Sequence, residues 1–192
     1  MTDPVLVVID MQRIFGDPAS DWFTPRFAEA AVTIERMLPA FGERVVFTRF
    51  VAPEHPVGAW VPYYEQWPFA LVAPDDPLYD LVEPFGTALA EAEAEAGHGP
   101  RVVTETTFGK WGAALADAID GSDDIVLAGV STDCCVLSTA LAAADAGIRV
   151  RVAADACAGL SDADHQRALD AMALYAPLIE ITDSQRATAG IR

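Results

Sequence analysis

Residues 124–144 read DIVLAGVSTDCCVLSTALAAA, and this stretch decides the fold class. Residues 125–128 are apolar and rich in branched side chains, which predicts a buried strand. Residues 129–132 break the run, and from Asp133 onward small and apolar residues recur at helical spacing. The stretch therefore predicts a strand, a tight turn and a helix, which is the repeating unit of a parallel α/β sheet.

Two cysteines, Cys134 and Cys135, stand in the first turn of the predicted helix. Unpaired backbone N–H groups and the helix dipole lower the pKa of a thiol at that position and favour the reactive thiolate. The same N–H groups can bind an oxyanion. Alternatively, the two small side chains only fill a tight packing position, as free cysteines often do. Spacing alone leaves both interpretations open.

Residues 5–9 form a second apolar run, which ends at Asp10. The run predicts the first, central strand of the sheet, with a carboxylate at its C-terminal end. Ligands of open α/β sheets bind at that edge, so Asp10 is a candidate catalytic residue. The alternative is that Asp10 caps a following helix.

Both stretches resemble motifs of one family. Residues 129–136, GVSTDCCV, resemble the nucleophile motif of the isochorismatase-like cysteine hydrolases, which include nicotinamidases and N-carbamoylsarcosine amidase. Residues 10–12, Asp-Met-Gln, followed by Phe15 resemble the first motif of the same family.

The resemblance implies a role for each motif residue. Cys135 takes the position of the nucleophile, Cys134 takes a variable position, and Asp10 takes the position of the general base. The resemblance also implies a cis peptide bond between Val130 and Ser131. It further implies an oxyanion hole formed by the backbone N–H groups of Ser131 and Cys135.

The third catalytic residue of the family is a lysine at the end of the third strand. Counting back from Leu115 on the following helix reaches Thr104 or Glu105, whereas the chain's only lysine is Lys110. Three alternatives follow: Glu105 replaces the lysine, Lys110 reaches the site, or the chemistry has changed. The alignment favours Glu105, which would share a proton with a nearby Asp10. Lys110 otherwise lies on the surface of a helix.

Residues 51–77 contain six prolines and show no clear periodicity, so they predict a long loop. A loop of that length in a compact domain is usually functional, and aromatic rings can form the walls of a small-ligand site. We expect residues 51–77 to form a specificity loop or lid, with a substrate-binding set of Phe15, Arg49, Trp60, Tyr63 and Tyr64. Arg49 could bind a substrate carboxylate through two hydrogen bonds. Alternatively, the rings pack a dimer interface and Arg49 is a surface charge.

Nicotinamidases carry an Asp-x-His metal motif after the second strand. The corresponding residues 48–51 read TRFV, and His55 stands alone. A lone histidine is weak evidence for a metal ligand, so we expect no catalytic metal and no cofactor.

The pattern of the whole chain predicts alternating strands and helices. Strands are expected at residues 5–9, 44–50, 101–104, 125–128, 149–153 and 177–181. Helices are expected at 25–38, 78–96 with an interruption near Pro84 and Gly86, 109–119, 133–144 and 161–175. This order predicts one α/β domain over residues 1–192, an open, mostly parallel six-stranded sheet with helices on both faces, as in a Rossmann-like three-layer sandwich.

Composition excludes several classes of protein. The formal net charge of −17 argues against a nucleic-acid partner, because phosphate binding needs basic patches. No apolar run approaches the roughly 18 residues of a membrane span. Three cysteines do not form a disulfide framework, which favours a reducing cytoplasm. We expect a cytoplasmic homodimer or homotetramer without a membrane partner.

Residues and resemblance together predict a metal-independent hydrolase of a small amide or carbamoyl C–N bond that is not a peptide bond. The reaction would pass through a thioester on Cys135. The isochorismatase branch of the family lacks the cysteine, so Cys135 favours amide chemistry. The alternative is a catalytically altered member that binds a small molecule, because Glu105 stands where the family has lysine.

Overall fold

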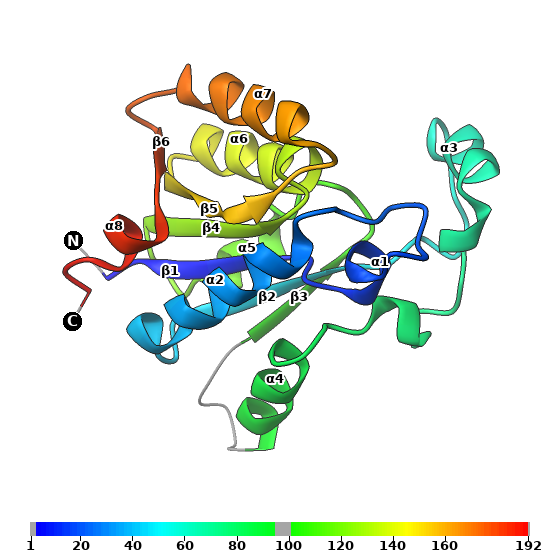
Figure 1. The fold of residues 1–192 in the computed structure, drawn as a ribbon, viewed down its shortest axis with the longest axis horizontal. Coiled ribbons are helices and arrows are strands. Elements are labelled where there is room, and N and C mark those ends of the chain that lie inside the picture. The colour runs from blue at the N-terminus through cyan, green and yellow to red at the C-terminus, as the bar shows by residue number, and fades with distance from the viewer. Residues whose placement is uncertain (1–2, 95–100, 192) are drawn as a thin grey trace.

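Six parallel strands form one sheet in this computed structural model, which describes residues 3–94 and 101–191 (Figure 1). Their order across the sheet is β3-β2-β1-β4-β5-β6. The strands are β1 (Val5–Ile9), β2 (Val45–Phe50), β3 (Arg101–Glu105), β4 (Asp124–Val130), β5 (Arg149–Ala158) and β6 (Ile179–Thr182). The prediction of an α/β fold with a six-stranded parallel sheet is confirmed.

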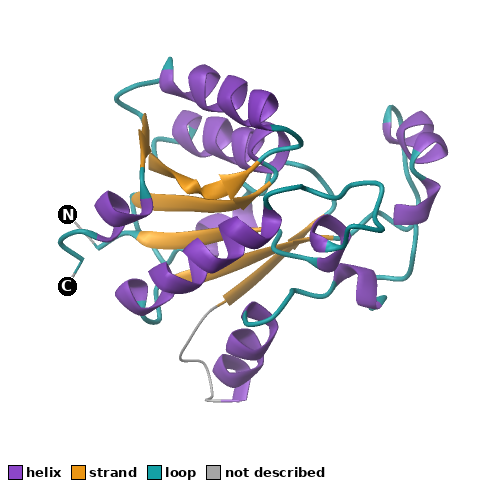
Figure 2. Ribbon diagram, viewed as in Figure 1, coloured by secondary structure: helices purple, strands orange, loops and turns teal. Residues whose placement is uncertain are grey.

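Helices cover both faces of this sheet and complete three layers (Figure 2). One face packs against α2 (Phe27–Phe41), α4 (Phe85–Ala94) and α8 (Ser184–Thr188). The other face packs against α5 (Ala113–Ala118), α6 (Leu137–Asp145) and α7 (Asp162–Ala173). None of the helices that the structure describes is long and apolar enough to cross a membrane.

Side-chain periodicity explains why β1 lies at the centre. All five of its residues are buried; Leu6 and Val8 join one core cluster, whereas Val7 and Ile9 join the other. Successive strand residues point to opposite faces, so a strand covered on both sides is apolar throughout. The stripe that α2 buries instead has the three- and four-residue spacing of a helix: Phe27, Ala30, Ile34, Met37 and Phe41.

Several predicted boundaries are wrong where proline or a turn decides the backbone. The predicted loop 51–77 contains the short helix α3 (Trp60–Gln66) and a 3₁₀ turn, Pro68–Ala70. The helix predicted over residues 78–96 was expected to be interrupted near Pro84 and Gly86, and within the described residues α4 indeed begins at Phe85, whereas residues 80–84 are not helical. Proline lacks the N–H that a helix needs, and Pro84 directly precedes α4. The helix expected from residue 109 begins only at Ala113.

The C-terminal ends of the parallel strands meet at one edge of the sheet. Asp10 follows β1, residues 106–112 follow β3, and a single π-helical turn, Thr132–Val136, follows β4. Helix α3 and the turn Pro68–Ala70 lie beyond this edge (Figure 1). A further short helix, α1 (Arg13–Gly16), and a 3₁₀ turn, Pro77–Tyr79, flank the same region.

Candidate active site

Asp10 is held rigidly where β1 ends. Its side chain is fully buried, and its backbone has a positive φ of 49°, which is uncommon for a residue other than glycine. The Asp10 N–H donates to the Thr48 hydroxyl (3.1 Å), and that hydroxyl donates to Asp10 Oδ1 (2.6 Å). Thr48 on the neighbouring strand β2 therefore fixes both the backbone and one carboxylate oxygen.

The second carboxylate oxygen meets the only lysine of the chain. Lys110 Nζ lies 3.0 Å from Asp10 Oδ2, and neither side chain is exposed. Nζ also donates to the Thr107 carbonyl (2.7 Å) and lies 5.2 Å from the centre of the Phe50 ring. A buried ammonium without partners would be very costly, so these contacts explain how Lys110 is tolerated inside the protein.

Glu105, which the alignment favoured, is not part of this cluster. Its side chain is half-buried at the end of β3, and it forms no hydrogen bond or ion pair with Asp10 or Cys135 in the part of the chain that the structure describes. The count from Leu115 assumed the family's spacing between its lysine and a leucine on the following helix. Residues 106–112 instead form an irregular turn, in which the Lys110 N–H donates to Thr139 on α6 (2.9 Å). This bond brings Lys110 to Asp10.

The two cysteines lie in the π-helical turn between β4 and α6. Cys135 is buried and Cys134 is half-buried. The peptide bond between Val130 and Ser131 is cis, as the family resemblance implied. The Thr139 hydroxyl donates to the Cys135 carbonyl (2.7 Å), so Thr139 contacts both the lysine segment and the cysteine turn.

Electrostatics keeps the proton on Cys135 in the resting protein. Its hydrogen bond to Cys134, its burial and the nearby Asp10 carboxylate raise the pKa of the Cys135 thiol, and Lys110 opposes them. The same hydrogen bond lowers the pKa of Cys134. A buried thiol that is protonated at neutral pH needs a base beside it before it can act as a nucleophile.

A cavity of about 370 Å³ opens on this cluster. Its lining includes both cysteines and Ser131, which directly precedes their turn. Most of the remaining lining is aromatic: Phe15, Trp22, Phe50, Tyr63, Trp67 and Phe108. Asp21, Thr24, Asp133 and Leu160 complete the lining. A concave, mostly apolar site with a few polar groups is typical of a small-molecule pocket.

Only two of the five predicted substrate-binding residues line the cavity, namely Phe15 and Tyr63. The Arg49 guanidinium instead donates to the backbone carbonyls of Tyr79 (3.3 Å) and Pro74 (3.4 Å). Trp60 packs against Phe108 and Tyr63 behind the lining, with ring centres 5.0 and 5.3 Å away.

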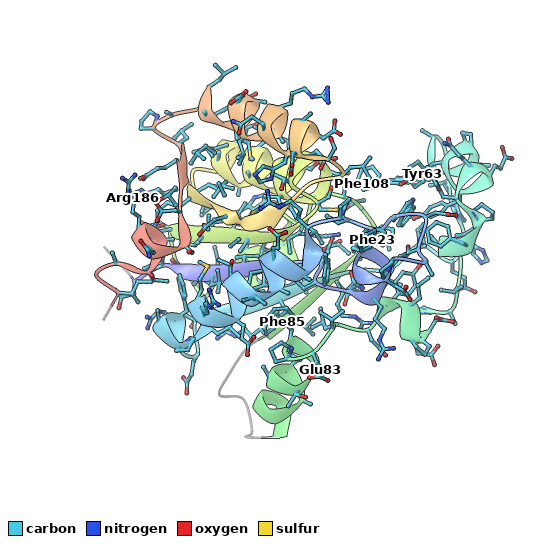
Figure 3. The ribbon with its side chains drawn as sticks, viewed as in Figure 1. Phe23, Tyr63, Glu83, Phe85, Phe108 and Arg186 are labelled. Atoms are coloured by element: carbon cyan, nitrogen blue, oxygen red, sulfur yellow. The ribbon has the colours of Figure 1, made fainter. Side chains whose placement is uncertain are left out.

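Tyr64 is buried beneath Trp60. Figure 3 shows Tyr63 and Phe108 next to each other, although Tyr63 comes from α3 and Phe108 follows β3. Arg49, Trp60 and Tyr64 are therefore not among the residues that line the cavity.

Sequence reasoning missed the central ring of the cavity, Trp22. This ring contacts Phe15, Phe50 and Tyr63 at centre-to-centre distances of 6.1, 5.7 and 5.9 Å. It lies in the segment that follows α1, close to the strand edge where ligands of this fold class bind. Its position shortly after the first motif is the one sequence feature that could have identified Trp22 as a lining residue.

A second pair of contacts anchors the cysteine turn to the loop after β5. The Asp133 carboxylate accepts a hydrogen bond from the Leu160 N–H (2.9 Å). The Thr132 hydroxyl and His165 Nδ1 are 2.8 Å apart, and burial lowers the pKa of His165. His165 is therefore neutral at pH 7 and contacts the turn rather than the cavity.

No group of three or more His, Cys, Asp or Glu side chains among the described residues could hold a metal ion. His55 lies on the surface beside Glu54, 3.9 Å away. The absence of a metal and of a cofactor stays a prediction.

Comparison with known proteins gives one family and a consistent fold. The family model described as the isochorismatase domain matches residues 4–185. A cysteine hydrolase from Pseudomonas syringae pv. phaseolicola has a similar structure, with a TM-score of 0.78 and 20% identity over 97% of this chain and 91% of that chain. Comparison with curated protein sequences found no match.

Two further structures have the same fold. A nicotinamidase from Bacillus subtilis superposes with a TM-score of 0.73 and 19% identity, covering 95% of this chain and all 100% of the other. A putative isochorismatase hydrolase from Oleispira antarctica gives a TM-score of 0.75 and 20% identity over 99% and 100% of the two chains. At these identities the likeness establishes the fold.

Proposed function

The chain belongs to the isochorismatase domain family, and from that premise we propose that it is a metal-independent cysteine hydrolase of a small amide or carbamoyl C–N bond. One observation carries the proposal. The buried ion pair between Asp10 and Lys110 acts electrostatically on the Cys135 thiol, and Cys135 lines a cavity of small-molecule size. A base, a cation and a nucleophile are thus gathered at one site.

Each member of the cluster has a distinct task in this reaction. Asp10 accepts the proton of the Cys135 thiol, which burial and hydrogen bonding otherwise keep protonated. Lys110 balances the Asp10 carboxylate and stabilises the thiolate once it forms. Lys110, rather than Glu105, is therefore the third member of the proposed site.

The proposed reaction has two steps. The Cys135 thiolate attacks the substrate carbonyl, and the resulting oxyanion binds the backbone N–H groups of Ser131 and Cys135. The C–N bond breaks, and ammonia or an amine leaves with the proton that Asp10 had accepted. Asp10 then removes a proton from water, which attacks the thioester, releases the acid and restores the thiol.

The alternative of a catalytically altered binding protein depended on Glu105 standing in place of the lysine. The ion pair of Lys110 with Asp10 removes the observation that favoured it. Within residues 51–77, Tyr63 and Trp67 line the cavity, which supports a role for this segment as the specificity lid.

Substitution of the two adjacent cysteines tests the proposal. Ammonia release is screened over a panel of small amides and carbamoyl compounds, and the variants are assayed on the compounds that are cleaved. Cys135→Ala should lower kcat on the order of a thousandfold or more, because it removes the nucleophile. Cys134→Ala should retain much of the activity, since this side chain takes the variable position. Covalent labelling by an electrophilic amide analogue should likewise require Cys135.

Circular dichroism of both variants controls for folding. Loss of activity in Cys134→Ala with retention in Cys135→Ala would show that the register of the nucleophile motif is wrong. If no amide is cleaved and Cys135 resists labelling, the proposed function itself fails.

A further inference from the structure

The charged groups in the cavity wall are all of one sign. Two carboxylates, those of Asp21 and Asp133, line the cavity, and none of its lining residues is Lys, Arg or His. The Asp133 carboxylate accepts a hydrogen bond from the Leu160 N–H (2.9 Å), and no ion pair of Asp133 is found in the described part of the chain. The chain as a whole has a formal net charge of −17. An anionic substrate would find no counter-charge in this wall.

Three basic side chains that lie close in sequence to lining residues have partners elsewhere. Lys110 is fully buried against Asp10. The Arg49 guanidinium is bound to the backbone carbonyls of Tyr79 and Pro74. Arg26, close in sequence to the lining residues, pairs with Glu29 (2.6 Å) on the surface. The predicted role of Arg49 in binding a substrate carboxylate therefore has no support in the geometry.

Aromatic rings form most of the rest of the wall, and several of them are grouped around Trp22. Phe15 stacks on the Trp22 ring with an interplanar angle of 9°, and Tyr63 and Trp67 lie 5.9 and 6.2 Å from it, centre to centre. The face of an aromatic ring carries negative potential, and it attracts a cation within about 6 Å of the ring centre. Several such faces around one space form a box suited to a positive charge.

We propose that the substrate of this site is an amide whose other end is a cation, with a methylated or quaternary ammonium as the best fit. The aromatic rings that make up most of the wall cannot accept the strong hydrogen bonds that a primary ammonium requires when it leaves water, which leaves only a few polar groups, Asp21 and Asp133 among them, to do so. A methylated ammonium needs few or none, and its methyl groups pack against the rings. The inference rests on the proposed hydrolase function, because it places the scissile carbonyl at Cys135 and the ammonium among the rings.

Three amides of matched length test the charge preference. They are 4-(trimethylammonio)butanamide, its neutral isostere 5,5-dimethylhexanamide and the anionic 4-carbamoylbutanoate. With the full chain we expect kcat/KM for the cationic amide to exceed that of the neutral isostere by about tenfold, and the anionic amide to be the poorest. Equal rates for the cationic and neutral amides, or a preference for the anion, would overturn the inference while leaving the hydrolase intact.

Two substitutions in the wall show whether the preference arises there. Asp21→Asn removes one charge from the exposed rim and should reduce the cationic preference by about fivefold. Trp67→Leu removes one ring, keeps an apolar side chain and should also reduce it. Asp145→Asn is the matched control, because Asp145 is an exposed carboxylate at the last residue of α6, outside the lining. An equal effect of Asp21→Asn and Asp145→Asn, with no effect of Trp67→Leu, would show that only the net charge matters and would contradict the proposal.

Binding to the inactive Cys135→Ala protein separates this inference from the proposed function. Trp22 and Trp67 line the cavity, so a cation entering the box should change tryptophan fluorescence. We expect the dissociation constant of the cationic amide to be about tenfold lower than that of the neutral isostere. If no amide is hydrolysed but this preference is found, the hydrolase proposal fails and the ligand class stands. If both amides bind equally, the ligand class is wrong whatever the activity.

Discussion

A backbone hydrogen bond positions Lys110, which does not stand where the family motif has its lysine. Its N–H donates to Thr139, and its ammonium then reaches Asp10 inside the protein. Breaking a buried ion pair by removing one partner is strongly destabilising, because the other charge is left uncompensated. The site and the stability of the fold therefore depend on the same residue.

This dependence gives a prediction for Lys110→Met. We expect the variant to lose about 3–5 kcal/mol of unfolding free energy, measured by urea denaturation, and to lose hydrolytic activity. The matched control is Glu105→Gln, which should change stability by about 0.5 kcal/mol or less and keep its activity. An inactive Glu105→Gln beside an active Lys110→Met would restore the assignment made from the alignment.

His165 predicts how acid affects stability. Burial lowers its pKa in the folded protein below the unfolded value of about 6.5, so the unfolded chain binds a proton more readily. The neutral His165 ring contributes to the free energy of unfolding at any pH above the pKa of the unfolded chain. This contribution is lost as the pH falls through that pKa toward the lower pKa of the folded protein. The Tm should therefore fall more in the wild type than in His165→Gln between pH 7.5 and 5.5, by about a degree.

His55 supplies the control for that measurement. Its side chain is 87% exposed, so His55→Gln should follow the wild-type pH dependence. If the Tm of His165→Gln and the Tm of His55→Gln both depend on pH as that of the wild type does, the role of His165 is contradicted.

At the residue scale the sequence was informative where a motif fixed the register. Asp10 directly follows β1, and Cys135 lies in the turn after β4, where the family motif fixed which cysteine takes the position of the nucleophile. The third member could not be placed, because the path of residues 106–112 depends on contacts with α6 that leave no periodic signal. Counting residues along the sequence therefore does not predict which side chain of such a turn reaches Asp10.

At the scale of elements, β1 and β4 lie unusually close to each other at Gly129. A Cβ added there would lie 2.1 Å from the Ile9 carbonyl oxygen, and the backbone has a φ of +119°. Gly129→Ala should therefore lower the unfolding free energy by several kcal/mol in urea, or prevent folding, because backbone has to move.

Gly147→Ala is the matched control. Gly147 also has a positive φ, +89°, but no atom lies within 4 Å of its added Cβ. It should cost only the conformational penalty of about 1–2 kcal/mol. Similar losses in the two variants would mean that backbone conformation, rather than the contact with Ile9, makes Gly129 necessary.

Elements with regular periodicity were predictable, and proline-rich ones were not. The stripe of α2 and the Ser161 cap of α7 follow directly from residue spacing; the Ser161 hydroxyl accepts from the Asp164 N–H (3.1 Å). In contrast, α3 carries Pro62, and its rings pack on one another and on Phe108 rather than along one helical stripe. Contacts with distant segments decide the structure there.

At the scale of the whole molecule, the prediction of a metal-free reaction can be tested directly. If Asp10, Lys110 and Cys135 supply all the chemistry, activity should survive exhaustive dialysis against EDTA with less than about a twofold change. Ammonia release before and after dialysis measures this. Loss of activity that zinc or manganese restores would disprove it. The homodimer or homotetramer expected from the sequence also stays a prediction.

The cavity shows how far whole-molecule features can be predicted. The edge of the sheet where it opens follows from the fold class, because the C-terminal ends of parallel strands gather there. The residues that line the cavity do not follow from the fold class, because they come from separate connections between elements; examples are Trp22, Phe108 and Leu160. Each of them contributes one side chain without any recognisable motif.

The strand order makes assembly of the candidate site a late event in the synthesis of the chain. Strands β1 and β4 are neighbours in the sheet, with Val5 opposite Ile125, yet nearly the whole first two thirds of the sequence separates them. A nascent chain on the ribosome carries Asp10 long before Cys135 is synthesised, and the two meet only when this long-range ladder closes. Enzyme activity during refolding should therefore appear with the native population and not with any earlier intermediate.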